Sequence, residues 1–557
     1  MNKSPFKSKL LIVLIALMIA FILSLIIRPY VKGLTISNCG DITSSGYYEM
    51  NQTIISDTDC INIYSDNVIL NCSWFSIINS GEHSYEGGIG IDGNNNITIQ
   101  NCILKNFEIY LNNGYGFNLK NILIENSTEG ITSVNSNDTE IVNYTGKDII
   151  REAIIFEDSN NLTINDSYFV NVGYEETNNI LIVGDAYNIG NYKNILIENT
   201  TIFNSSSISI KINNIDNVIL ENLNLTKNHG GIYLKYINNF SLLNSFFSES
   251  ENYNVEIDYA DNGKIENNNF YNSDWYGLYL YFSNDILIEN NNFSNFYIAL
   301  PNIYSDNNSF KNIEINDSNV CFYVRGSYIN TTILNLNCSE YDLYSRSNSE
   351  LNVYETSLRD KSILRALENS EINLYNVSGS EYFTDNTSQI TKFWKLTIVN
   401  PINNSLVIKD KNNNVVFNQT INETYLWLKE FESKDNQTSY FSPYSLKAEK
   451  LGFFPKTFNI VLNSNKIFNV ESLLKIPNVI TGNFCYTTKI LKQVNGYEKC
   501  NETGCFWINE TKYVMCPFSC RENMTNLGAV CGEPDFTIYF IAILIIIIIF
   551  VFLAKVS

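Results

Sequence analysis

Histidine, methionine and proline are scarce in this sequence. Its 557 residues include two histidines, His83 and His229, five methionines and nine prolines. Histidine is a common metal ligand and the usual acid–base group near neutral pH, so its scarcity argues against histidine-based metal sites and catalysis. Copper binding is disfavoured as well, because histidine and methionine do not cluster. We therefore expect neither a metal nor a cofactor.

Positive charge is also in deficit. Lys and Arg number 37 against 58 Asp and Glu, which gives a formal charge of −21. A field of this sign repels phosphates, so the composition excludes nucleic acid as an expected partner. Hydrophobic residues make up 45% of the chain and suffice for a large core.

Two segments, 10–27 and 536–553, are apolar and long enough to cross a bilayer. Lys3, Lys7 and Lys9 precede the first segment and Lys555 follows the second. The positive-inside rule places these ends in the cytoplasm, so the intervening chain is expected outside a cell membrane. Residues 1–33 are then either a cleaved signal peptide or a signal anchor, and 534–557 are a transmembrane anchor.

Sequons and cysteines agree with an extracellular location. Asn-x-Ser/Thr sequons occur between the two segments, for example at Asn51, Asn161, Asn224, Asn292 and Asn523. They indicate a glycoprotein, although an Asn-rich chain also produces sequons by chance. The even number of cysteines, 12, is typical of chains whose disulfides persist.

A short repeat dominates the sequence. The unit Asn194 to Asn199 reads Asn-Ile-Leu-Ile-Glu-Asn, and copies begin at about 22 to 23 residue intervals. The clearest copies start at Asn217, Asn239, Asn262 and Asp285, and looser ones at Asn96, Asn121, Asn161, Asn312, Asn348 and Asn369. This period predicts about a dozen stacked turns between residues 50 and 380.

Each unit alternates apolar and polar residues, which predicts a β-strand. A second alternating run follows a glycine in several units, as in 231–235 and 277–281. No segment of helical periodicity separates the strands, so they must stack in parallel and bury an apolar column between turns. Asn at the strand ends suits left-handed corners and can bond the equivalent Asn one turn away. A leucine-rich repeat is the alternative, because 220–228 fits its pattern, but no unit has room for a helix.

These units resemble the right-handed parallel β-helix repeats of pectate-lyase-like proteins, in particular those of the NosD-like and carbohydrate-binding/sugar-hydrolysis groups. The opening stretch from Cys39 to Cys72 is similar to the start of such domains in archaeal cell-surface proteins. The resemblance covers roughly 37–380 and implies an all-β solenoid over 34–384. It implies little about activity, because the family includes lyases, hydrolases, epimerases and adhesins.

The first six cysteines are expected to form disulfides inside the solenoid. Cys39 and Cys60 bracket the first strand and would cap the open end. Cys72 and Cys102 follow comparable strands in neighbouring turns, and Cys321 with Cys338 is a third pair. Buried free thiols are the alternative.

Two further modules are expected after the period stops. Short alternating runs in 385–475 predict a small β-sandwich, similar to carboxypeptidase-regulatory-like modules. Residues 476–533 predict a disulfide-rich stalk; zinc is the alternative, but the segment has no histidine and no Cys-x-x-Cys pair. Its cysteines are Cys485, Cys500, Cys505, Cys516, Cys520 and Cys531.

No catalytic motif can be assigned. Hydrolases of the resembled fold use clustered carboxylates, and lyases use Arg or Lys with acidic calcium ligands. The polar positions in second-strand runs that would serve are Asp92, Glu157, Glu256 and Asp258, with Arg151, Arg325 and Tyr233 as helpers. A solvated acidic face explains the same carboxylates without chemistry, and His229 stands alone in its motif.

A binding face has better support. Outward positions on neighbouring second strands carry aromatic rings and carboxylates, which together suit a sugar: Tyr233, Glu256, Asp258, Trp275, Tyr279 and Tyr281. The alternative is that Tyr, with 36 copies, only stiffens strands. The sequence thus predicts a membrane-anchored surface protein that acts in adhesion, envelope structure or glycan binding. A non-catalytic role is favoured over an enzymatic one. The protein's expected partners are the membrane, surface glycans and other envelope proteins; the alternative is a diverged polysaccharide lyase or glycoside hydrolase.

Overall fold

The computed structural model describes 33–81, 87–173, 177–184, 192–332, 335–358, 362–377, 381–399, 404–420, 425–450, 456–469 and short strands between 483 and 532. Within these ranges every regular element is a β-strand. A helix long and apolar enough to cross a membrane is absent from these described residues. Both hydrophobic segments, 10–27 and 536–553, lie outside the described residues.

The chain divides into two compact units. The first holds residues up to 372 together with 378–388, and the second holds 373–377 together with the chain from 389 onward. β38 (Glu371–Tyr375) covers the boundary between them.

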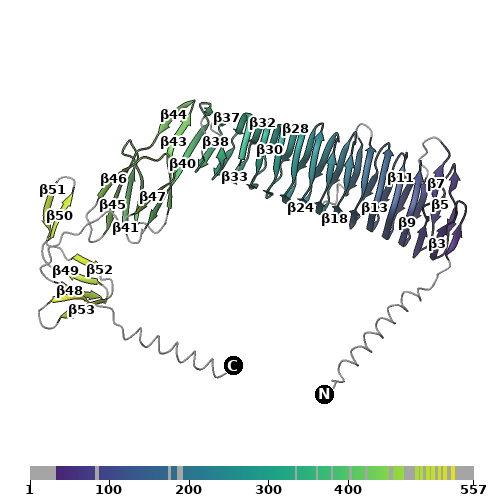
Figure 1. Cartoon of the computed structure of the whole chain (residues 1–557), viewed down its shortest axis with the longest axis horizontal. Helices are drawn as coiled ribbons and strands as arrows, with labels where there is room; N and C mark the ends of the chain where they lie inside the picture. Colours follow the sequence, from purple (N-terminus) through teal and green to yellow (C-terminus); the bar gives the residue numbers. More distant parts are fainter. Residues whose placement is uncertain are drawn as a thin grey trace, which may run out of the picture. The chain divides into compact units, whose positions relative to one another are not determined.

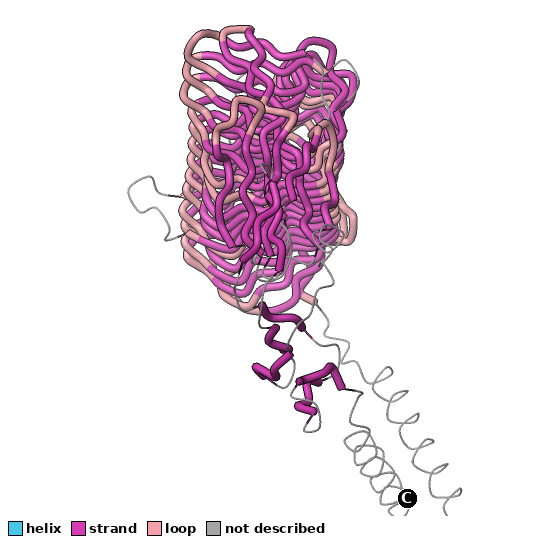
Figure 2. The backbone as a smooth tube through the Cα atoms, turned by 90° about the vertical axis from the view of Figure 1, so that its left-hand side faces the viewer, coloured by secondary structure: helices cyan, strands magenta, loops and turns pink. Residues whose placement is uncertain are grey.

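The first unit is a right-handed parallel β-helix of about 15 turns. Each full turn contributes one strand to each of three parallel sheets, so that like strands stack turn upon turn (Figure 1). Figure 2 shows the strands superposed along the stack, with loops at the corners. The parallel stacking that the sequence predicts is confirmed, whereas the third strand of each turn was not foreseen.

The first sheet holds the repeat units themselves. Its strands are β1 (Leu34–Ile36), β3 (Gly46–Met50), β6 (Val68–Asn71), the first parts of β9 (Asn95–Lys105), β11 (Tyr115–Glu125) and β13 (Asn137–Ile149), then β15 (Leu162–Asn165), β18 (Lys193–Glu198), β21 (Asp216–Glu221), β24 (Asn238–Leu243), β27 (Asp261–Glu266), β29 (Leu287–Glu289), β31 (Ser309–Lys311), β33 (Tyr328–Thr332) and β35 (Glu350–Tyr354).

The second sheet follows the first along each turn. Its strands are β4 (Ile54–Ser56), β7 (Ser76–Asn79), the later parts of β9, β11 and β13, then β16 (Tyr168–Val172), β19 (Thr201–Phe203), β22 (Asn224–Thr226), β25 (Phe246–Ser250), the first parts of β28 (Asn269–Tyr281), β30 (Asn292–Ile303), β32 (Glu314–Arg325) and β34 (Asn335–Arg346), and β36 (Ser357–Leu358).

The third sheet contains the second alternating runs. Its strands are β2 (Gly40–Ile42), β5 (Ile61–Ile63), β8 (Gly87–Asp92), β10 (Glu108–Asn112), β12 (Ile131–Val134), β14 (Ile154–Glu157), β17 (Asn178–Val183), β20 (Ile208–Asn213), β23 (Gly230–Lys235), β26 (Tyr253–Asp258), the later parts of β28, β30, β32 and β34, then β37 (Ile363–Leu367) and β39 (Glu381–Thr384).

Inward side chains form continuous apolar columns. Ile195 and Ile197 of β18 are buried while Leu196 and Glu198 are partly exposed, as the alternation predicts. Elsewhere in the core, Phe247, Phe270 and Phe293 stack with ring centroids 5.1 and 4.6 Å apart. Stacking therefore supplies the apolar contacts that a single turn lacks, at roughly 25 cal/mol per Å² of buried apolar area.

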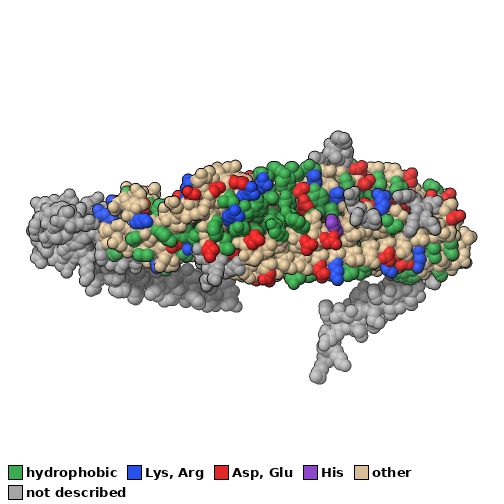
Figure 3. All heavy atoms as spheres, turned by 90° about the horizontal axis from the view of Figure 1, so that it is seen from above, with side chains coloured by type: hydrophobic (Ala, Val, Ile, Leu, Met, Phe, Trp, Pro, Cys, Tyr) green, Lys and Arg blue, Asp and Glu red, His purple; other side chains and the backbone are tan. Residues whose placement is uncertain are grey.

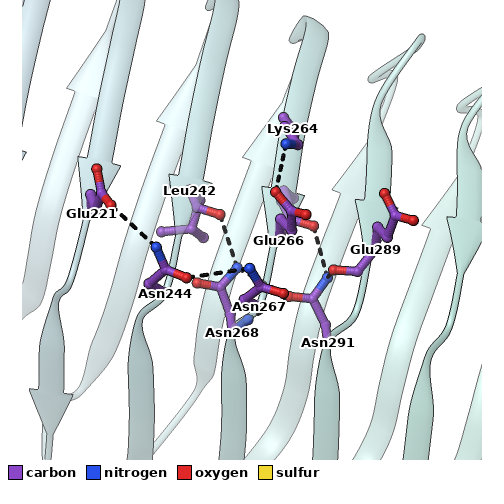
Figure 4. A network of polar contacts seen from close by, with 10 residues as sticks. Glu221, Leu242, Asn244, Lys264, Glu266, Asn267, Asn268, Glu289 and Asn291 are labelled. Carbon is purple, nitrogen blue, oxygen red and sulfur yellow. Dashed lines mark hydrogen bonds and ion pairs between the residues drawn. The ribbon is translucent and has the colours of Figure 1, made fainter.

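Asparagine fills the corners, as expected. Asn194 and Asn217 adopt positive φ values of 65° and 57°, and the Asn217 amide donates to Asn194 across one turn at 3.2 Å. Figure 4 shows such a ladder, in which Asn267 donates to Asn244, which in turn donates to Glu221, at 3.3 and 3.2 Å. Each bond contributes about 1 kcal/mol, and repetition along the stack makes the sum matter.

Three disulfides cross-link the solenoid. They join Cys39 to Cys60, Cys72 to Cys102, and Cys321 to Cys338, which are the three pairs named from the sequence. The first two disulfides lie in its opening turns.

The second unit begins with two small sheets. One pairs β40 (Gln389–Val399) with β43 (Tyr425–Lys434), β43 with β44 (Gln437–Tyr440), and β40 with the parallel β47 (Lys466–Asn469). The other is antiparallel, in the order β42 (Val415–Thr420), β41 (Asn404–Lys409), β45 (Tyr444–Lys450) and β46 (Lys456–Ile460). Buried residues from both sheets, including Leu396, Leu428, Leu406 and Leu446, form one hydrophobic cluster.

Seven short strands follow. They are β48 (Asn483–Thr487), β49 (Ile490–Gln493), β50 (Tyr497–Asn501), β51 (Gly504–Ile508), β52 (Lys512–Met515), β53 (Ser519–Asn523) and β54 (Gly528–Gly532). Their backbone register sets Cys500 opposite Cys505 and Cys520 opposite Cys531. The side chains of the six stalk cysteines lie outside what the structure describes, so their pairing stays a prediction.

Candidate functional site

Five of the six residues proposed for binding lie on neighbouring strands of the third sheet, and Trp275 comes directly before the third-sheet part of β28. In one outward row Tyr233 is in register with Glu256, and Glu256 with Tyr279. The next outward row sets Asp258 beside Tyr281. Adjacent strands are about 4.8 Å apart, so the register holds these side chains next to one another on a rigid surface.

Asp258 is fixed by a hydrogen bond from a neighbouring turn. The Tyr233 hydroxyl donates to Asp258 Oδ2 at 2.8 Å, and Asp258 is 9% exposed. Its second carboxylate oxygen, Oδ1, is buried and has no hydrogen-bond partner among the described residues. Burial raises the pKa of Asp258, while the Tyr233 hydroxyl and Lys235 oppose the rise.

Glu256 titrates near neutral pH. Burial, and then the charge of Asp258, raise its pKa from 4.5 to about 7, against an opposing effect of Lys235. Both protonation states are therefore populated at neutral pH, and the side chain can either donate or accept a hydrogen bond. Such versatility suits contact with sugar hydroxyls, which themselves donate and accept.

Further aromatic rings surround this pair of carboxylates. The ring centroids of Tyr276 and Tyr279 are 5.1 Å apart. Trp275 packs edge to face against Tyr297, with ring centroids 5.7 Å apart. Trp275 and Tyr297 are about half exposed. We call the set Tyr233, Glu256, Asp258, Trp275, Tyr276, Tyr279, Tyr281 and Tyr297 the aromatic face. Figure 3 shows hydrophobic side chains, tyrosine included, gathered over the middle of one long face, with acidic and basic side chains beside them.

One corner of the third sheet carries a second group of rings, which we call the corner column: Tyr236, Tyr259, Phe282 and Tyr304. Successive ring centroids are 5.2, 5.2 and 5.1 Å apart and the rings are stacked. All four residues have positive φ, between 47° and 54°, a conformation that favours Asn or Gly. Because the rings cover one another, they present edges rather than faces to solvent.

The other carboxylates named as catalytic candidates do not converge. Asp92 and Glu157 share the outward row of Asp258 on the third sheet, but several turns separate them. Several strand spacings of about 4.8 Å place them beyond the reach of one reacting bond. Nδ1 of His229, the histidine without a family motif, contacts Glu251 Oε2 at 2.8 Å on the surface.

An acidic group in the earlier turns was missed from the sequence. Glu129 contacts Arg151 Nη1 at 2.5 Å, and Arg151 Nε lies 3.6 Å from the buried Glu152. Burial, and then Glu129, raise the pKa of nearby Glu108 to about 7. The signal that could have revealed the group is that Glu129 and Glu152 each come two residues before a strand of the third sheet, one turn apart.

One grouping of metal-ligand types occurs among the described residues: Cys321, Cys338 and Asp342. The two sulfurs form a disulfide and are not thiolates, so they cannot act as zinc ligands. Asp342 instead accepts the backbone N–H of Cys338 at 3.0 Å. The grouping is accounted for by structure alone.

Comparisons with known proteins agree on the fold. The family model for the right-handed beta helix region matches residues 175–304. No curated protein matches the chain. Among solved structures, the chain is 14% identical to the catalytic domain of a GH87 α-1,3-glucanase in complex with nigerose, with a TM-score of 0.26. The match covers 54% of this chain and 61% of that one.

Two other solved structures match the chain at similarly low identity. A mutant of the periplasmic alginate epimerase is 11% identical over 61% of this chain and 72% of that chain, with a TM-score of 0.26. PfbA, a surface adhesin of Streptococcus pneumoniae, is 12% identical over 72% of this chain and 90% of that chain, with a TM-score of 0.24. Likeness at this level concerns the fold alone.

Proposed function

We propose that this protein is a membrane-anchored cell-surface protein that binds glycans through the aromatic face. The observation that carries the proposal is the gathering of rings and carboxylates on neighbouring turns: Tyr233, Glu256 and Tyr279 are held in register, and the half-exposed Trp275 contacts Tyr297. Rings pack against the apolar faces of sugars, and carboxylates accept hydrogen bonds from sugar hydroxyls.

Rigidity supports binding by this surface. The ladder of backbone hydrogen bonds and the buried column beneath hold the rings in place before a ligand arrives. A preorganised surface loses little conformational entropy on binding, so more of the contact energy remains as affinity. An adhesin or an envelope-binding protein needs this property more than it needs a deep pocket.

The remaining modules fit the same role as proposals. The hydrophobic segments 10–27 and 536–553 would hold the chain in the membrane, with the solenoid outside and glycosylated. The two sheets of 389–469 would form a β-sandwich, and the cysteine-rich strands a disulfide stalk. Membrane fractions resisting alkaline extraction, together with protease access to the solenoid on intact cells, would support this topology; release of the protein by alkali would refute the anchors.

A double substitution tests glycan binding. We expect Tyr279→Ala with Tyr281→Ala to weaken binding of the full-length protein to its glycan at least tenfold, about 1.4 kcal/mol or more, because two contact rings are lost. Affinity would be measured on a glycan array and then by titration of the best ligand.

Tyr110→Ala is the matched control. Tyr110 is an exposed outward tyrosine of the same sheet, in β10, and lies in the row that leads to Tyr233. We expect it to bind as the wild type does. Equal glycan binding by the double variant and the wild type would exclude the aromatic face.

A second candidate function is glycoside hydrolysis. Glu256 and Asp258 are two residues apart on one strand face, so their Cα atoms are about 7 Å apart, a spacing that permits the separation of about 6.5–9.5 Å between the carboxyl groups of inverting hydrolases. Glu256, with its pKa near 7, could act as the acid. Release of reducing ends by the wild type but not by Glu256→Gln would favour the enzyme; binding without product formation would favour the adhesin.

A further inference from the structure

Three arginines lie on successive turns of the third sheet, directly beyond the aromatic face. Arg325 of β32 is in register with Arg346 of β34, and Arg365 of β37 is in register with Tyr344 of β34. We call these three residues the arginine group. Neighbouring strands are about 4.8 Å apart, so like charges are held side by side. In a chain with a net charge of −21, such a concentration of guanidinium groups stands out.

Protein carboxylates neutralise this group only in part. Glu368 forms an ion pair with Arg346, whose hydrogen bond holds the pKa of Glu368 at about 2. Among the described residues, neither Arg325 nor Arg365 has a carboxylate within ion-pair distance. They contact aromatic groups instead: Arg365 Nη1 donates to the Tyr341 hydroxyl at 2.8 Å, and Arg325 lies over the Tyr304 ring at 5.6 Å.

Two donors of the group are also unused. Nε of Arg325 and Nε of Arg346 are buried and have no hydrogen-bond acceptor within the described part of the chain. A buried donor without an acceptor carries a desolvation penalty, which a rotation of the guanidinium toward an incoming acceptor would remove. Guanidinium groups bind planar or multi-oxygen anions, such as carboxylate and sulfate, through two parallel hydrogen bonds.

We propose that the arginine group binds the anionic substituent, a carboxylate or a sulfate, of an acidic glycan that lies along the aromatic face. This inference rests on the glycan-binding function proposed above and specifies its ligand class. Tyr281 is in register with Ile303, and Ile303 with Arg325. Two strand spacings amount to about 10 Å, so one oligosaccharide can contact both groups.

The charges also give the ligand a direction. Glu256 and Asp258 lie at the β26 end of the aromatic face, whereas the arginine group lies at the β32–β37 end. An anionic substituent is repelled at the first end and attracted at the second. An acidic glycan therefore binds with a charged sugar over β32 and extends from there toward β28.

The test uses three galactose-based probes that differ in charge: oligogalacturonate, a sulfated galactan and neutral galactan. We expect the full-length protein to bind at least one acidic probe tenfold more tightly than the neutral one, with an affinity that falls as salt rises. Arg325→Gln should reduce that affinity about tenfold and leave neutral-probe binding within twofold. Arg365→Gln provides a second variant at a separate strand.

Lys211→Gln is the matched control, because Lys211 is a cation in the outward row of the same sheet, on β20. We expect no change from it. Equal affinity for neutral and acidic probes, or an acidic preference that survives both arginine substitutions, would overturn the acidic-ligand inference and leave glycan binding standing. A wild type that binds no glycan on the array would overturn both.

Discussion

The early and late turns of the third sheet share one backbone but present different surfaces. From β10 to β20 one outward row reads Tyr110, Thr132, Ile155, Leu181 and Lys211. From β23 to β34 the same row carries Tyr233, Glu256 and Tyr279, and then Tyr323 and Tyr344. Inward residues do not differ in this way, because the same kind of buried aliphatic column runs beneath both halves.

The corner of the sheet shows the same contrast. In the early turns the left-handed position is occupied by Asn113, Asn135 and Asp158. In the late turns the corner column replaces them with four stacked rings. Stability therefore comes from positions that repeat in every turn, while recognition is confined to outward positions that vary. A repeat fold can acquire a binding surface locally without changing its core.

The largest expected effect belongs to the shared core. Leu111→Ala in β10 and Leu280→Ala in β28 remove fully buried side chains from one inward column of the third sheet. Each should lower the free energy of unfolding by about 2–5 kcal/mol, through lost burial and the cavity left behind. Urea denaturation followed by circular dichroism measures the change.

Hydrogen exchange should place the loosened amides in the turns next to each substitution, since a solenoid turn contacts only its neighbours. Suppose that one variant were destabilised by less than about 1 kcal/mol and the other by the expected 2–5 kcal/mol or so; the two halves would then not share an equivalent core. That outcome would break the comparison.

The fold could be read from the sequence because its signals are repeated. The alternation in Asn194 to Asn199 and its copies predicts that the unit is a strand, which side chains face inward and how the strands stack. The asparagines at the corners belong to the same units. The second-sheet strands were missed because a strand as short as Thr201–Phe203 carries too little pattern. The estimate of a dozen turns fell short because turns at both ends depart from the repeat.

The aromatic face was predicted only in part. Period two places Tyr279 and Tyr281 on one side, and that expectation holds in the structure. Tyr276 and Tyr297 were missed because the register shifts between Ser273 and Tyr276 and interrupts the alternation. The corner column was missed because rings are unusual in left-handed positions, so nothing local marks Phe282 as a corner residue.

A smaller effect, the dependence of folding stability on pH, should occur in both halves of the solenoid. Glu256 and Glu108 each have a pKa of about 7 when folded and an ordinary value of 4.5 when unfolded. The folded state thus binds the proton more tightly, and stability is full below about pH 4.5 and falls as pH rises through 7. The loss is at most about 3 kcal/mol per residue, and less after solvent screening.

Glu256→Gln and Glu108→Gln should each narrow the gap in Tm between pH 5 and pH 8, because glutamine does not ionise. Glycan affinity sharpens the comparison: its pH dependence should weaken in Glu256→Gln, where Asp258 still titrates, and persist in full in Glu108→Gln. If both variants kept the wild-type difference in Tm, the elevated pKa values would be wrong. If both changed glycan binding alike, recognition would not be confined to the late turns.

The smallest effect is expected when corner residues are exchanged between the halves. Tyr236→Asn puts the common corner residue at the end of the stacked column. It relieves about 1–2 kcal/mol of left-handed strain and loses the ring contact with Tyr259, about 0.5–1.5 kcal/mol, and the cation–π contact with Lys235, about 0.5–1 kcal/mol. The net change in unfolding free energy should therefore stay within about 1 kcal/mol. Asn135→Tyr, the reverse exchange, introduces the strain without neighbouring rings and should destabilise by about 1–2 kcal/mol. Both are measured by urea denaturation against the wild type. Equal destabilisation by the two exchanges would mean that the column does not compensate the strain of its own rings, and that its aromatic residues must be explained by ligand contact alone.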